Sequence, residues 1–176
     1  LDALGTEVGY PFFMKPYDGG AWVGVTRVGN VDDLRRGYAE SGKRVMHLQK
    51  AVEPFDVFVR VIGIGPQFRM ARYDPTAAHH DRYKIDYYFL DGEEHSLLRD
   101  MAMTINAFFG WEFNSCEALR KDGTLYPIDF ANACPDFQVT SLHYYFPELV
   151  KCMIRWSLFC AATRRKMQPN LDWQPF

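Results

Sequence analysis

The stretch from Cys116 to Asp136 constrains the fold more than any other part of the sequence. Two apolar-rich segments, Phe113–Leu119 and Thr124–Phe130, flank the tight-turn sequence Lys121-Asp122-Gly123. An Asp-Gly pair between two such segments is typical of a β-hairpin. The sequence therefore predicts two antiparallel strands here, with residues of one strand lying beside residues of the other.

The predicted hairpin brings oxygen-bearing side chains together. Glu117 lies on the first strand, whereas Asp129 and Asn132 lie at the end of the second. Two carboxylates and an amide oxygen are hard donors, which suit Mg²⁺ held together with substrate phosphates. The same residues also suit an ordinary hairpin with charged edges, so both interpretations stay open at this point.

A second stretch lies about a hundred residues upstream, from Tyr10 to Val25. A short hydrophobic strand delivers Lys15, and the pair Gly19-Gly20 then leads into another strand. Glycine allows backbone N–H groups to approach an anion closely, and lysine supplies a point charge for phosphate oxygens. The stretch is neither a Walker A loop nor a Rossmann fingerprint, because no helix follows the glycines. A plain hairpin is the alternative.

Together, the two stretches resemble the ATP-grasp superfamily, and the resemblance runs from about Gly9 to Asp136. Met14-Lys15-Pro16 is similar to the family's lysine strand, and Gly19–Val25 to its phosphate-covering loop. Val45–Val52 is similar to the hinge strand, and Asn132-Ala133-Cys134-Pro135 to the Asn-x-x-Pro that closes the metal site. The resemblance implies an α+β fold in which two subdomains with mainly antiparallel sheets clamp a nucleotide.

The resemblance also implies where the subdomains and ligands lie. We expect a lid-like subdomain over residues 1–52, a C-terminal subdomain over 53–165 and a tail over 166–176. ATP and Mg²⁺ are the expected cofactors. The residues expected at the nucleotide are Lys15, Gly19, Gly20, Gln49, Lys50, Val52 and Asp56, and those expected at the metal are Glu117, Asp129 and Asn132.

Three positions depart from the family pattern. The acidic ligand usually lies two residues before the asparagine, where this chain has Phe130, and Asp129 lies three before. Strand alternation turns residues 129 and 130 to opposite faces, so Asp129 reaches the metal only if the strand contains a bulge. Asp136 stands where glycine is common, and Gln49 where the hinge often has Glu.

The resemblance implies the chemistry of a carbon–nitrogen ligase. A carboxylate attacks the γ-phosphate of ATP, and an amine or similar nucleophile then opens the acyl phosphate. Lys15 and Arg72 are the candidate catalytic residues. Arg60, Arg69 and Arg72 either point at the phosphates or lie solvated or paired on the sheet. A nucleotide-binding module without ligase activity and a kinase-type phosphotransferase are the alternatives.

Composition excludes several other classes of protein. The chain is 48% hydrophobic, which excludes disorder, and its net charge of −2 gives no electrostatic case for nucleic acid or membrane binding. No apolar run approaches the roughly 20 residues of a membrane span, and no signal peptide is present. The four cysteines lack Cys-x-x-Cys spacing, which favours structural thiols in a reducing cytoplasm over zinc.

The expected partners are small-molecule or peptide carboxylates and amines, and a homodimer is left open. The identity of the acceptor stays open among an amino acid, a peptide, a sugar acid and a protein side chain. Because the first residue is Leu rather than Met, we expect a fragment or processed chain that lacks the further N-terminal domain of ATP-grasp enzymes.

Hydrophobic periodicity and capping signals predict the remaining elements. Helices are expected over 31–41, 93–109 and 147–165, with the end of a helix over 1–8. Strands are expected over 45–50, 56–63, 67–73 and 85–90.

Overall fold

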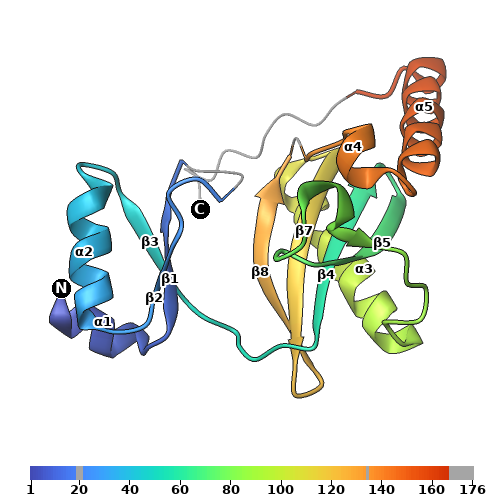
Figure 1. Ribbon diagram of the computed structural model, residues 1–176. Coiled ribbons are helices and arrows are strands. Elements are labelled where there is room, and N and C mark those ends of the chain that lie inside the picture. The colour runs from blue at the N-terminus through green and yellow to red at the C-terminus, as the bar shows by residue number, and fades with distance from the viewer. Residues whose placement is uncertain (19–21, 134, 167–176) are drawn as a thin grey trace. The chain divides into compact units, whose positions relative to one another are not determined.

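The computed structural model describes residues 1–18, 22–133 and 135–166. The chain divides into two compact units, Leu1–Glu53 and the part that starts at Pro54, and each contains helices and one antiparallel sheet (Figure 1). The predicted α+β class with antiparallel sheets is therefore confirmed. Within the described ranges, every helix is too short or too polar to cross a bilayer.

Unit 1 is a small sheet with two helices. Its strands lie in the order β2-β1-β3, and both pairings are antiparallel. The elements are α1 (Asp2–Val8), β1 (Phe12–Pro16), β2 (Thr26–Val28), α2 (Val31–Ser41) and β3 (Met46–Lys50). The side chain of Asn30 accepts hydrogen bonds from the backbone N–H groups of Asp32 and Asp33, so α2 begins where the sequence predicts.

One face of the unit 1 sheet packs on the helices. Phe12 and Met14 of β1 form a buried cluster with Val28 of β2 and Leu34 of α2. Side chains alternate along a strand, so the next residues, Phe13 and Lys15, lie on the opposite face.

Unit 2 is built on a larger sheet with the strand order β6-β5-β4-β7-β8, again entirely antiparallel. The strands are β4 (Val57–Ile64), β5 (Gln67–Tyr73), β6 (Tyr83–Lys84), β7 (Phe113–Lys121) and β8 (Thr124–Asn132). The remaining elements are the 3₁₀ turn η1 (His79–Asp81) and the helices α3 (Gly92–Phe109), α4 (Val139–Leu142) and α5 (Phe146–Thr163).

Helix α3 covers one face of this sheet. It begins with a capping box formed by Asp91 and Glu94, in which each side chain bonds the other residue's backbone N–H. Leu98 and Ala102 of α3 pack against a buried cluster from β4 and β7 that comprises Val57, Val59, Val61, Cys116 and Ala118.

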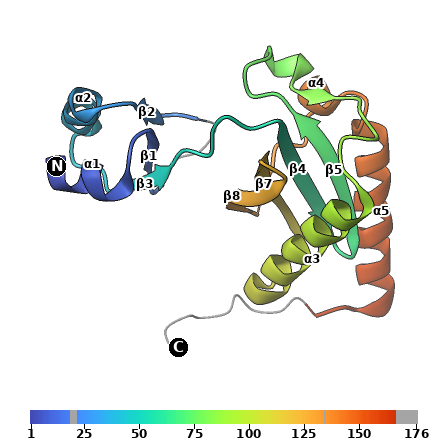
Figure 2. The ribbon, with the colours of Figure 1, turned by 90° about the horizontal axis from the view of Figure 1, so that it is seen from below.

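Helix α5 runs alongside β5, on the side of this strand away from β8 (Figure 2). Arg69 of β5 pairs with Ile62, whose neighbour Val61 belongs to the cluster under α3, so Arg69 points away from α3. Its guanidinium forms an ion pair with Glu148 of α5. The two faces of the sheet are therefore distinct, and the candidate ligands can be assigned to one of them.

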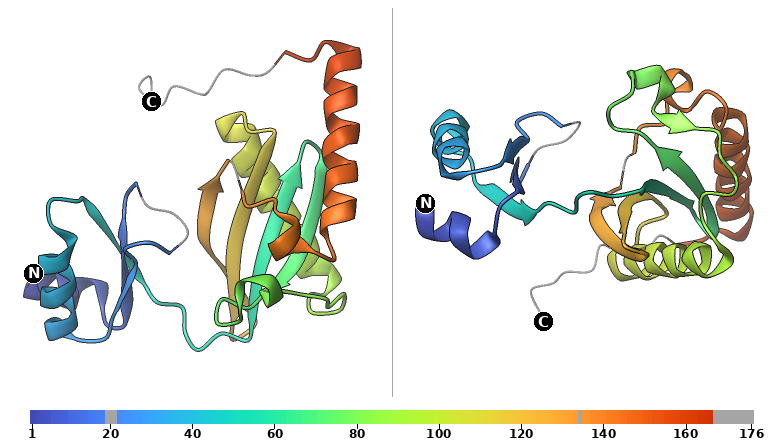
Figure 3. Two further views of the ribbon diagram at one scale, coloured as in Figure 1. Left: turned by 45° about the horizontal axis from the view of Figure 1, so that its top comes forward. Right: turned by 60° about the horizontal axis from the view of Figure 1, so that its bottom comes forward.

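The predicted hairpin is present and lies at one edge of the sheet (Figure 3). Asp122 and Gly123 form its turn with positive φ values of 49° and 73°. The prediction of a strand over 85–90 was wrong, because it is Tyr83 and Lys84 that pair with β5. Asp86 instead accepts a hydrogen bond from the backbone N–H of Tyr88 and binds Arg72, which turns the chain away from the sheet.

Candidate functional site

The β7–β8 pairing is irregular at the position of the predicted metal ligands. Glu117 lies opposite Asp129 and Ser115 lies opposite Asn132, while Ala118 lies opposite Pro127. The register therefore shifts on both sides of Glu117, and β8 contains the extra residues. Such an irregularity can turn Asp129 to the face that carries Glu117.

These shifts place all three predicted ligands on one face. Asp129 and Asn132 are three residues apart, so a regular strand would turn them to opposite sides of the sheet. Their partners Glu117 and Ser115 are only two apart, and residues two apart on a strand share a face. Glu117, Asp129 and Asn132 therefore lie on the side of the sheet that faces away from α3.

Arg60 of β4 lies on the same face and contacts this group. Its Nε is 3.5 Å from Oε1 of Glu117, and the two side chains are only 12% and 18% exposed. Its guanidinium also donates to the hydroxyl of Tyr83 at 2.9 Å and to Oγ of Ser115 at 3.4 Å. This face of the sheet thus carries the largely buried guanidinium of Arg60 beside the carboxylate of Glu117.

The surroundings of Arg60 keep it charged. Burial disfavours the charged guanidinium, but the facing groups of Tyr83, Glu117 and Tyr73 outweigh this effect and raise the pKa of Arg60. The rings of Tyr73 and Tyr83 lie 5.7 and 6.0 Å from the guanidinium carbon. Burial raises the pKa of the Tyr83 hydroxyl to about 12, so this phenol stays protonated at neutral pH.

The donor set fits magnesium better than a transition metal. In the parts of the chain that the structure describes, no three His, Cys, Asp or Glu side chains group to hold a metal. Glu117, Asp129 and the Asn132 amide offer only oxygen, and Mg²⁺ typically uses one or two carboxylates together with substrate phosphates and water. These residues fit Mg²⁺ if a nucleotide supplies the other ligands.

Lys15 lies on the open face of the unit 1 sheet. It pairs with His47, and Phe13 on the same face pairs with Gln49, so Lys15 and Gln49 share this side. The ring of Trp22 packs edge-on against Phe13 at 6.0 Å. Lys15 forms no ion pair with any residue that the structure describes, which leaves its ammonium available to an anion.

The other residues predicted at the nucleotide are dispersed. Lys50 pairs with Phe12 and so lies on the opposite face from Lys15, and Val52 is half-buried after the end of β3. Gly19 and Gly20 lie outside the described residues.

Asp56, at the start of unit 2, is bound by Arg120. The guanidinium donates to the Asp56 carboxylate at 2.6 and 3.0 Å, and these hydrogen bonds hold the pKa of Asp56 below its usual value. The same guanidinium bonds Glu94 of α3 at 2.9 Å. Asp56 therefore joins β4 to β7 and α3, and a role at ribose would require this ion pair to open.

Arg72 lies on the wrong side of the sheet to join the carboxylates. It pairs with Val59, a member of the cluster under α3, and its guanidinium bonds Asp86 at 2.8 Å. Of the three arginines singled out in the sequence, Arg60 is the one beside Glu117. The signal that selects it is its register pairing with Glu117 across neighbouring strands.

The three cysteines that the structure describes offer no second site. Cys116 and Cys152 are buried, and the three cysteines that are described are all free. Burial raises the pKa of the Cys116 thiol to about 11, which makes it inert at neutral pH. This agrees with the structural thiols expected from the sequence, although Cys134 lies outside the described residues.

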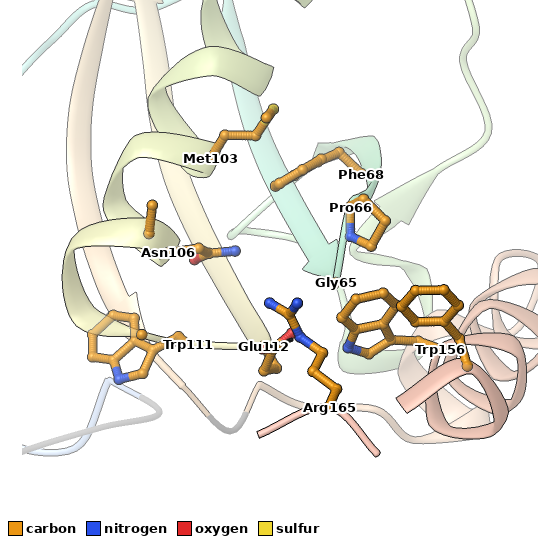
Figure 4. Close-up of a pocket in the computed structure, with 12 residues that line it drawn as sticks. Gly65, Pro66, Phe68, Met103, Asn106, Trp111, Glu112, Trp156 and Arg165 are labelled. Atoms are coloured by element: carbon orange, nitrogen blue, oxygen red, sulfur yellow. Dashed lines mark hydrogen bonds and ion pairs between the residues drawn. The ribbon is translucent and has the colours of Figure 1, made fainter. Parts of the chain in front are cut away.

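A cavity of about 540 Å³ opens elsewhere in unit 2, between α3, the β4–β5 turn and α5 (Figure 4). Its walls are mainly apolar and include Phe68, Met103, Trp111 and Trp156, with the ion pair of Arg165 and Glu112 at its rim. None of the predicted ligands lines it. The cavity is therefore separate from the face that carries Glu117.

Comparisons with known proteins bear on the fold of the chain. No family model matches the chain. A curated relative, a D-alanine–D-alanine ligase of Geobacillus thermodenitrificans, is 26% identical over 158 residues, which is 80% of this chain and 43% of the relative.

Several solved structures share the fold of the chain at low sequence identity. The D-alanine–D-alanine ligase from Bacillus anthracis superposes with a TM-score of 0.66 at 17% identity, covering 93% of this chain and 59% of that one. A biotin carboxylase from Campylobacter jejuni, solved as a β-γ-ATP complex, gives 0.65 at 20% identity, covering 81% and 35%. The chain thus spans between 35% and 59% of these proteins, and the likeness establishes its fold.

Proposed function

We propose, from the ATP-grasp fold that this chain has, that it binds ATP with Mg²⁺ and serves an ATP-dependent carboxylate–amine ligation. The observation that carries the proposal is the shifted β7–β8 register, which puts Glu117, Asp129 and Asn132 on one face beside Arg60. An ordinary hairpin has no need of two register shifts around one half-buried carboxylate. The likeness to D-alanine–D-alanine ligases and a biotin carboxylase supports the reaction class.

Each unit contributes a different group in this proposal. Lys15 of unit 1 donates to phosphate oxygens, and Gln49 lies on the same face of its sheet. In unit 2, Glu117 and Asp129 hold the metal with the Asn132 amide, and Arg60 offers a permanent positive charge to an anionic oxygen of the substrate. Bound Mg²⁺ would neutralise charge on the transferred phosphoryl group.

This arrangement suits phosphoryl transfer, which depends mainly on positioned cations and needs no nucleophilic side chain. A carboxylate substrate attacks the γ-phosphorus, the bond to the β-phosphate oxygen breaks, and ADP leaves. An amine then attacks the acyl carbon of the acyl phosphate, phosphate leaves, and an amide forms. Arg60 is placed to hold the carboxylate or acyl phosphate, and Arg72 is left out because Asp86 binds it on the other face.

A nucleotide-binding module without ligation is the second candidate. The observation that favours it is the contact of Arg60 with Glu117, because a guanidinium already neutralises the carboxylate that a metal would use. In that case nucleotide binding would be independent of metal.

Calorimetric titration of the full chain with a non-hydrolysable ATP analogue, with and without Mg²⁺, tests the proposal. We expect binding that depends on Mg²⁺, because the carboxylate face binds the analogue only through the ion. Metal-independent binding would support the module instead, and absence of binding under both conditions would refute the ATP site in this chain. Amide formation from carboxylate and amine panels, measured with ADP release, then tests the ligation.

Replacing Lys15 by Ala should weaken binding of the analogue by roughly 10- to 100-fold, since charge-assisted hydrogen bonds contribute about 1.5–3 kcal/mol. Lys43→Ala is a matched control, because Lys43 is an exposed lysine of the same unit outside the strands. Circular dichroism should show both variants folded. Equal affinity of the two variants would remove Lys15 from the site.

A further inference from the structure

We infer that Asn114 is a positioning residue, whose side-chain amide holds the β8 irregularity in the shape that lets Asn132 and Asp129 face Glu117. The inference rests on the proposed function and adds a residue that has no ligand contact of its own. Asn114 lies on β7, one residue before Ser115, and is only 1% exposed.

The amide of Asn114 bonds two backbone groups of β8. Its Nδ2 donates to the carbonyl oxygen of Phe130 at 3.0 Å, and its Oδ1 accepts from the backbone N–H of Asn132 at 3.0 Å. A bulge leaves backbone groups without their usual ladder partners. Here one side chain supplies a donor and an acceptor to residues that flank Ala131, within the shifted segment.

The two backbone groups of β8 fix which way this amide points, and Asn106 of α3 bonds it in that orientation. Its Oδ1 accepts a second hydrogen bond from Nδ2 of Asn114 at 2.9 Å, and Asn106 is itself buried. If the Asn114 amide were flipped, its oxygen would face the carbonyl oxygen of Phe130 and its NH₂ would face the N–H of Asn132. The two backbone contacts therefore select one orientation.

Hydrophobic packing does not explain why two asparagines, Asn106 and Asn114, are buried together here. Asn114 and Asn106 lie beside the apolar cluster that includes Cys116, where a buried amide is unfavourable unless its bonds are made. The bonds that are made run from helix α3, through Asn106 and Asn114, to the segment that ends in Asn132. The pair thus connects the rigid helix to the proposed metal ligands.

The test uses the full chain and the variant Asn114→Ala, which removes the donor and the acceptor together. Mn²⁺ in place of Mg²⁺ is titrated by electron paramagnetic resonance in the presence of the ATP analogue. We expect Mn²⁺ affinity to fall by roughly 10- to 100-fold, the loss typical of residues that orient metal ligands.

Val61→Ala is the matched control for loss of stability. Val61 is fully buried in the α3-side cluster on β4, and its side chain has no polar group that could bond the β8 backbone. It should lower the melting temperature but leave Mn²⁺ affinity unchanged. If both variants lose metal affinity in proportion to their stability, the role is structural and the inference fails.

Hydrogen exchange of the ligand-free chain gives a second readout that does not depend on metal. The Asn132 amide proton should exchange at least about tenfold faster in Asn114→Ala than in the wild type and in Val61→Ala, because its acceptor is gone. Unchanged exchange would show that Asn114 does not hold the Asn132 N–H. Faster exchange with unchanged Mn²⁺ affinity would show that Asn114 has no role at the metal. If the wild type itself binds no Mn²⁺ with the analogue, the proposed function fails, and the role of Asn114 at the metal fails with it. Hydrogen exchange would still show whether Asn114 holds the β8 backbone.

Discussion

Replacing Glu117 by Gln is expected to abolish the metal-dependent part of nucleotide binding. Gln keeps the shape of the side chain but loses the charge, and Mg²⁺ retains few protein ligands if this carboxylate is lost. The loss of Mg²⁺ affinity in the presence of the ATP analogue should exceed the roughly 100-fold upper range seen for residues that only orient ligands. Calorimetry with the analogue at several Mg²⁺ concentrations measures it.

Two further variants make this result specific. Glu112→Gln is the control, because Glu112 is also a partly buried carboxylate of unit 2 bound to an arginine, in this case Arg165. It should leave Mg²⁺ dependence intact. Asp129→Asn should reduce Mg²⁺ affinity as well, since the register puts Asp129 opposite Glu117. If Asp129→Asn has no effect, Asp129 is structural, and if Glu117→Gln has none, the metal is not held on this face.

Replacing Gly65 by Ala is expected to destabilise unit 2 by about 2–5 kcal/mol, from a left-handed conformation that costs about 1–2 kcal/mol and overpacking that costs about 1–3 kcal/mol. Gly65 forms the β4–β5 turn with a φ of 54°. A Cβ there would lie 2.3 Å from the Trp156 ring, and that indole already packs against Phe159 and Arg165. Urea unfolding followed by tryptophan fluorescence measures the change.

A substitution at Gly123 measures the cost of the left-handed conformation without the cost of overpacking. It lies in the β7–β8 turn with a φ of 73°, but a Cβ there would meet no atom within 4 Å. Gly123→Ala should therefore show only the conformational cost of about 1–2 kcal/mol. Equal losses in the two variants would show that contact with Trp156 contributes nothing.

The hairpin was predictable because its signals are local. An Asp-Gly turn between two apolar segments determines antiparallel pairing, and the strands extend only two residues beyond the predicted ends. The positions of Glu117, Asp129 and Asn132 followed from this pairing. The need for a bulge was also evident, since Asp129 lies three residues before Asn132.

Local sequence patterns could not predict which strands pair when those strands are distant in sequence. Arg60, Arg69 and Arg72 alternate with apolar residues in the same way, and only the pairing of β4 with β7 selects Arg60. The strand expected over 85–90 failed because the Asp86 side chain, which bonds Arg72 and the Tyr88 N–H, outweighs the β propensity of its aromatic neighbours.

The irregular strand β8 has a consequence for how this chain behaves at high concentration. β8 is the last strand on its side of the sheet as described, and an exposed strand edge is a template on which another chain can add a strand. Pro127 lacks the N–H that such an addition would use, and the register shifts bend the strand away from a flat edge. The distortion that gathers the oxygen ligands therefore also guards against self-association, so a version of β8 made regular for higher stability would aggregate more readily.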